Sequence, residues 1–130
     1  MNPDPERAMN SAPWTVERYF AGAPNALELY RTVERMAAGV GPHETRVSKS
    51  QISFPRHRGY AYCWRPDLYV KSTVPLVLSL ALPRNLGSPR FKQIVHPAAG
   101  IWMHHLELAD GTQLDSEVLG WMREAYDSAG

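Results

Sequence analysis

The sequence predicts an α+β fold, in which an antiparallel β-sheet of about five or six strands is packed by two N-terminal helices and one C-terminal helix. Apolar residues recur near the helical period of 3.6 before residue 43 and again after residue 115. Between these regions they alternate with period 2 in short segments rich in Ile, Val, Leu and aromatic residues. Short polar loops, not helices, join these segments, so consecutive strands are expected to pair antiparallel.

Capping residues mark the three helices. Thr15 is a plausible N-cap for a short first helix, and Pro24 suits the first turn of a second helix over 24–38. Gly39 and Gly41 supply the stop signals after that helix. Asp115 is placed to cap the final helix, whose apolar stripe includes Trp121 and Tyr126.

The alternation predicts which side chains share a face of the sheet. The expected strands cover 43–47, 50–54, 60–64, 76–82, 91–95 and 101–108, with 55–59 as a hairpin loop. Within 76–82, four leucines share one face while Val77, Ser79 and Ala81 share the other. Within 60–64, the aromatic rings of Tyr60, Tyr62 and Trp64 oppose the small Ala61 and Cys63. A sheet of this kind either receives a closely packed helix, the commoner outcome, or leaves a shallow groove.

Composition indicates one soluble domain over 14–130, preceded by a flexible tail at 1–13. The chain has 130 residues, of which 44% are apolar and 21% charged, enough for one hydrophobic core. The tail lacks the apolar stretch of a signal peptide, and the longest apolar run, 75–83, is too short to span a membrane. The single cysteine, Cys63, cannot form an internal disulfide. A cytoplasmic protein without a membrane partner is therefore expected.

Positive charge is concentrated in the middle of the chain. The net charge is +1, yet residues 43–96 contain nine Lys or Arg residues and only two Asp or Glu residues. Two interpretations remain open at this point. The segment forms a surface that attracts anions, or basic strands face acidic helices within the same molecule.

Two adjacent histidines lie in the apolar stretch 101–108. On a regular strand His104 and His105 point to opposite faces, so they cannot bind one metal together. A metal site would need His105, Glu107 and a third ligand such as His96, and neither a metal nor another cofactor is expected. His104 is expected in the core, bonded to a backbone carbonyl or a hydroxyl. Either histidine also has the chemistry of a general acid or base.

The remaining signal is a basic, aromatic-lined sheet face. No P-loop, GxGxxG or GxSxG motif is present, and no catalytic residue is assigned. The favoured function is binding of an anionic small molecule or nucleotide. The alternatives are a small enzyme that uses His104 or His105, a nucleic-acid-binding accessory domain, and a homodimer formed through Trp121 and Tyr126. The candidate ligand-binding residues are Arg46, Lys49, Gln51, Tyr62, Trp64, Arg65, Arg90, Lys92, His104 and His105.

Seven segments together carry a resemblance to a known family. They read, in chain order, WTVERYFAG, RVSKSQISF, YAYCWRP, LVLSLALPR, SPRFKQIVHP, WMHHLEL and WMREAYDSA. With them the chain resembles an uncharacterised bacterial family, domain of unknown function 5655, from Trp14 to the C-terminal helix. That family is similar in outline to the small YdhG-like domains, which implies an antiparallel sheet flanked by terminal helices. The resemblance implies no catalytic or ligand-binding residues.

Overall fold

The structure, a computed structural model, describes residues 13–130 and contains the expected α+β architecture. All six strands pair antiparallel in the order β1-β2-β3-β4-β6-β5. The fold prediction is confirmed, while all but the last residue of the predicted tail 1–13 lies outside the described residues. The elements are α2 (Val16–Tyr19), α3 (Pro24–Val40), β1 (Arg46–Val47), β2 (Ile52–Pro55), β3 (Gly59–Trp64), η1 (Pro66–Leu68), β4 (Leu76–Leu82), β5 (Gln93–Ala98), β6 (Ile101–Leu108), η2 (Gly111–Gln113) and α4 (Ser116–Ser128).

The helices begin where the capping residues predict. The Thr15 hydroxyl accepts a hydrogen bond from the Arg18 backbone N–H at 3.1 Å, and Asp115 accepts one from the Val118 N–H at 3.1 Å. Such bonds satisfy donors that have no partner inside a helix. Gly41 follows α3, and a Cβ atom there would lie 2.7 Å from the Tyr126 ring, so the glycine lets α4 approach closely.

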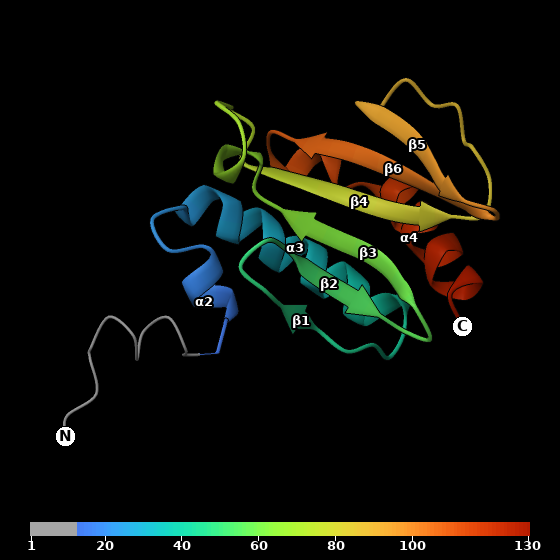
Figure 1. The fold of residues 1–130 in the computed structure, drawn as a ribbon, viewed down its shortest axis with the longest axis horizontal. Helices are drawn as coiled ribbons and strands as arrows, with labels where there is room; N and C mark the ends of the chain where they lie inside the picture. The colour runs from blue at the N-terminus through green and yellow to red at the C-terminus, as the bar shows by residue number, and fades with distance from the viewer. Residues whose placement is uncertain (1–12) are drawn as a thin grey trace.

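One face of the sheet carries the core. Ile52, Cys63, Leu78 and Leu106 are paired in register across the four central strands, and each is at most 1% exposed. Helices α3 and α4 lie on the same side of the sheet, as Figure 1 shows, and cover these side chains. The leucines of β4 therefore face the helices, as the alternation predicts.

A β-bulge corrects the prediction for Tyr60. The register between β2 and β3 shifts at Phe54 and Pro55, where Pro55 pairs with Gly59 and Phe54 with Ala61. The extra residue, Tyr60, is fully buried and packs against Tyr126 with a ring separation of 5.3 Å. Tyr60 thus belongs to the core and not to the aromatic row of the other face, because a bulge breaks the alternation of side chains.

The opposite face is not covered by a helix within the described residues, and we call it the open face. Its central row, in register, is Ser53, Tyr62, Ser79, His105 and Gln93. In Figure 1 this face is turned toward the viewer, with η1 beside the start of β4. Both outcomes considered for small side chains occur: helices cover Ala61 and Cys63 of β3, whereas Val77, Ser79 and Ala81 of β4 lie on the open face.

Candidate functional site

His104 lies on the helix-covered side and is fully buried. Its Nδ1 donates to the Trp102 carbonyl at 2.9 Å, and its Nε2 accepts from the Leu86 N–H at 3.1 Å. Both ring nitrogens are therefore bonded to the backbone, and burial lowers the pKa of the imidazole. The prediction of His104 as a core residue fits this environment. Its place among the predicted ligand-binding residues has no support here, because both ring nitrogens are bonded and the side chain lines neither hollow described below.

His105 lies on the open face and begins a chain of three side chains. Its Nδ1 lies 2.6 Å from the Ser79 hydroxyl oxygen, which accepts a hydrogen bond from Trp64 Nε1 at 2.9 Å. The indole nitrogen can only donate, so Ser79 must accept from it. Ser79 is 2% exposed, and a buried hydroxyl proton needs an acceptor. Nδ1 of His105 is that acceptor.

The hydrogen bond from Ser79 to Nδ1 determines the tautomer of His105. With Nδ1 accepting from Ser79, the ring proton of the neutral imidazole resides on Nε2. Burial, and to a smaller extent the charge of His104, lower the pKa of His105. The imidazole is therefore neutral at neutral pH and offers Nε2–H as a hydrogen-bond donor.

Two adjoining hollows share Trp64 and His105. The smaller, of about 130 Å³, is also lined by Gln51, Tyr62 and Met103. The larger, of about 450 Å³, we call the groove. Most ligand sites are concave, largely apolar and furnished with a few polar groups. This part of the open face meets that description.

The groove has an apolar side and a polar side. Tyr69 and Val70, which are 55% and 62% exposed, line it together with Trp64. The Tyr69 ring meets Trp64 edge-on at 6.1 Å, and its hydroxyl donates to the Ser50 carbonyl at 2.6 Å. The polar side comprises Lys92, Gln93, His105 and Glu107.

Five of the ten predicted ligand-binding residues line the two hollows: Gln51, Tyr62, Trp64, Lys92 and His105. Lys49 is exposed between β1 and β2 and lines neither hollow. The sequence interpretation missed Ser79, Tyr69 and Val70 as site residues. One feature of the sequence could have indicated Tyr69 and Val70: they form an apolar pair within a segment that connects two strands, where polar residues are usual.

Three of the predicted arginines line neither hollow and form ion pairs within the chain instead. Arg46 pairs with Glu44 at 3.2 Å and Arg65 with Asp67 at 2.8 Å. Arg90 lies 3.1 Å from Asp115 and 2.7 Å from Glu117, at the start of α4.

Three further arginines of the middle segment also have partners within the chain. Arg84 pairs with Glu124 at 3.0 Å, while Arg56 and Arg58 donate to the carbonyls of Tyr126 and Ser128 in α4. Four of the nine basic residues of this segment, Arg56, Arg58, Arg84 and Arg90, thus contact the C-terminal helix or its N-cap, as the second interpretation of the positive charge expects.

Neither a metal site nor an activated cysteine is present in residues 13–130. No group of three His, Cys, Asp or Glu side chains in this part of the chain could hold a metal ion. His96, the third ligand considered, stacks on Trp102 at 3.7 Å. Cys63 is fully buried, and burial raises the pKa of its thiol, so the reactive thiolate is disfavoured.

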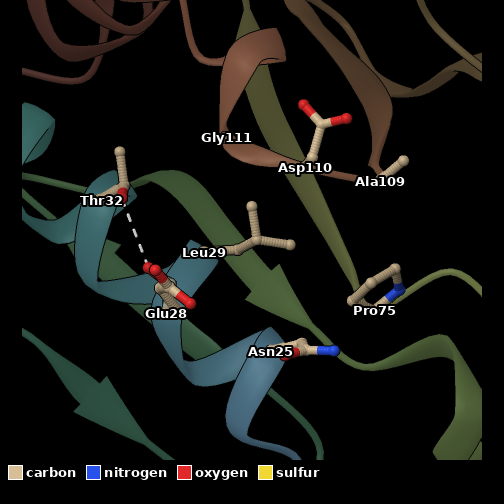
Figure 2. A pocket seen from close by; sticks show the side chains of 8 residues that line it. All are labelled: Asn25, Glu28, Leu29, Thr32, Pro75, Ala109, Asp110 and Gly111. Carbon is tan, nitrogen blue, oxygen red and sulfur yellow. Dashed lines mark hydrogen bonds between the residues drawn. The ribbon is translucent and has the colours of Figure 1, made fainter.

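A third hollow, of about 330 Å³, lies between α3 and the loops just before β4 and just after β6. Figure 2 shows Asn25, Glu28 and Thr32 of α3 on one side of it and Asp110 on the other. Asp110 caps η2, where it accepts hydrogen bonds from the N–H and the hydroxyl of Thr112. The Thr32 hydroxyl donates to the Glu28 carbonyl. Because Asp110 and Thr32 are already bonded within their own segments, the open face is the stronger candidate site.

The fold and the groove define a two-layer α+β domain whose sheet has one covered face and one open face with adjoining hollows. Residues 16–129 match the family described as "Domain of unknown function (DUF5655)". The match spans most of the chain, so the protein belongs to this family, and the predicted resemblance to domain of unknown function 5655 is confirmed. No curated protein and no solved structure matched the chain.

Proposed function

We propose that this protein is a non-catalytic binding module, whose groove holds a small molecule that carries a carboxylate or phosphate group on an aromatic or apolar body. The observation that carries the proposal is His105, which is held by Ser79 and Trp64 so that Nε2–H is the donor available at the groove. Lys92 lines the same groove and adds a positive charge. A donor and a cation side by side suit an anionic oxygen.

The apolar side of the groove supports the proposal that the ligand has an aromatic or apolar body. Trp64 and Tyr69 provide aromatic surface against which a planar or apolar group can pack. The volume of about 450 Å³ is at the lower end of the range for small-molecule sites. A single metabolite or nucleotide therefore fits the groove better than a macromolecule does.

The other predicted partners have less support. Nucleic-acid binding would require the arginines of the middle segment, and Arg46, Arg65, Arg84 and Arg90 are already in ion pairs. A homodimer through α4 would require Tyr126, which is 7% exposed, and Trp121, which packs on Phe91 with ring centroids 4.7 Å apart.

Two observations concern the location of the protein in the cell. Within residues 13–130 no helix is long and apolar enough to cross a membrane. A cytoplasmic location remains our proposal, supported by the buried, unpaired Cys63.

A thermal-shift screen tests the binding proposal. The probes are nucleotides, phosphorylated metabolites and aromatic organic acids, each at low and at moderate salt. We expect at least one class to raise the melting temperature, less so at the higher salt concentration, because screening weakens the contact with Lys92. The gain should shrink in Lys92→Gln and in Tyr69→Ala.

Lys49→Gln is the matched control for Lys92→Gln, because Lys49 is exposed and lines neither hollow. Stabilisation by no probe would contradict the proposal. An equal loss in both lysine variants would place the binding site outside the groove.

Catalysis by His105 is the second candidate, favoured by the neutral imidazole beside the groove. The Ser79–His105 pair does not resemble a serine hydrolase dyad, since Ser79 is almost fully buried and no carboxylate in residues 13–130 bonds to His105. General acid or base chemistry at Nε2 remains as the enzymatic option. Mass spectrometry of any ligand found in the screen tests this option. If the protein converts the ligand to a product and His105→Gln does not, the protein is an enzyme and not a binding module.

A further inference from the structure

The charges that line the groove are of both signs. Lys92 supplies an ammonium group and Glu107 a carboxylate, and neither forms an ion pair within residues 13–130. His105, which lies two residues before Glu107 on the same strand face, is neutral at neutral pH. The lining of the groove therefore has no net charge.

The place of Glu107 in the sheet matters for any ligand. It pairs in register with Val77, which in turn pairs with Trp64, so Glu107 and Trp64 flank Val77 on the open face. Both side chains line the groove. A ligand that lies along Trp64 with a single negative charge would meet a like charge at Glu107, which weakens binding.

A half-buried carboxylate in a ligand site favours a positively charged partner. Lys92 approaches the groove from the edge, where its backbone N–H donates to the His105 carbonyl at 2.8 Å. The two opposite charges thus come from different parts of the chain, Glu107 from β6 and Lys92 from the residue before β5, and His105 lines the same groove.

We propose that the groove recognises a zwitterion, namely a free α-amino acid with an aromatic or branched apolar side chain. The ammonium group of the ligand faces Glu107, its carboxylate faces Lys92 and His105 Nε2–H, and its side chain packs along Trp64, Tyr69 and Val70. This inference rests on the proposed binding function and narrows its ligand class from anions to zwitterions. It also explains why a site with a lysine retains a carboxylate.

Matched probes that differ only in charge test the inference. Tryptophan, phenylalanine and leucine are the zwitterions, their N-acetyl derivatives carry only the negative charge, and their amides carry only the positive charge. Titration calorimetry with the full chain should give the tightest binding for the zwitterion of at least one side chain. We expect each single-charge derivative of that amino acid to bind about fivefold more weakly, the effect of one partly exposed charge pair.

Glu107→Gln gives the decisive comparison. It should weaken binding of the zwitterion and bring its affinity close to that of the N-acetyl derivative, because the ammonium group loses its partner. Glu28→Gln is the matched control, since Glu28 lies at the hollow beside α3 and not at the groove, and it should leave all affinities unchanged.

The outcomes separate the two proposals. If an N-acetyl or amide derivative binds as tightly as its zwitterion, or if Glu107→Gln leaves their ratio unchanged, the zwitterion inference is overturned while the binding function stands. If no amino-acid probe binds but a nucleotide or organic acid does, the inference is likewise overturned. If no probe of any charge binds, the proposed function itself fails.

Discussion

The two faces of the sheet place adjacent histidines in opposite environments. His104 is opposite Leu80 on β4, fully buried, with both ring nitrogens bonded to backbone groups. His105 is opposite Ser79 and bonds through one nitrogen to a side chain, which leaves the other toward a groove. On the helix-covered face the imidazole completes the packing, whereas on the open face one ring nitrogen has no hydrogen-bond partner within residues 13–130. The two histidines therefore differ both in burial and in the partners of their ring nitrogens, and only His105 has a nitrogen available to a ligand.

The largest expected effect sharpens this contrast through packing. Leu78→Ala on the covered face should lower the free energy of unfolding by about 2–5 kcal/mol, because the cavity lies beneath α3 and α4. Met103→Ala on the half-buried open face should cost about 1 kcal/mol or less. Urea unfolding of both variants checks the pair. Similar losses in the two variants would contradict the assignment of one open face.

The next effect concerns the hydrogen-bonded chain on the open face. Ser79→Ala removes the acceptor of Trp64 Nε1 and the donor to His105 Nδ1, so we expect a loss of about 1–3 kcal/mol. Ser53→Ala, a serine on the same face for which no side-chain hydrogen bond is found in residues 13–130, is the control and should be nearly neutral. Nitrogen NMR of His105 supplies the independent readout. A proton on Nδ1 in the unaltered protein would refute the direction of donation.

The smallest effect is the pH dependence of stability. Burial lowers the pKa of both histidines below the ordinary value of 6.5, so the unfolded chain takes up protons that the folded chain excludes. Stability should therefore be complete above about pH 6.5 and decline as the pH falls toward the folded-state values.

His105→Gln should make the loss of stability at low pH smaller without disturbing the core. The remaining pH dependence in that variant then reflects His104, which NMR titration follows directly. Denaturant unfolding at a series of pH values measures the slope. An unchanged slope in His105→Gln would show that His105 titrates alike in the folded and unfolded chain.

Much of the sheet could be predicted because alternation is a local property. The faces of β4 and β6 follow directly from Val77, Ser79 and the histidine pair, and the register confirms them. Tyr60 could not be placed, since a single extra residue in a bulge leaves no mark in the pattern of apolar residues.

The site was harder to predict because its contacts join distant parts of the chain. Ser79 and His105 are 26 residues apart, and Arg90 and Asp115 are 25 apart. Charge density in the sequence identified Arg90 as a ligand residue, but the fold brings acidic residues of α4 to it. Aromatic residues in strands proved more informative than arginines, because strand parity determines where Tyr62 and Trp64 point.

The two edge strands of the sheet affect whether a protein with such an open face can aggregate. An exposed apolar face beside an unprotected edge strand invites aggregation, in which a second chain adds its own strand. Here β1 has only two residues, and β5 contains Pro97, which lacks an N–H, at an irregularity in the pairing with β6. Both edges are therefore poor templates for another strand. Tyr69 and Val70 can therefore remain exposed at the groove although neither edge of the sheet readily pairs with the backbone of a second chain.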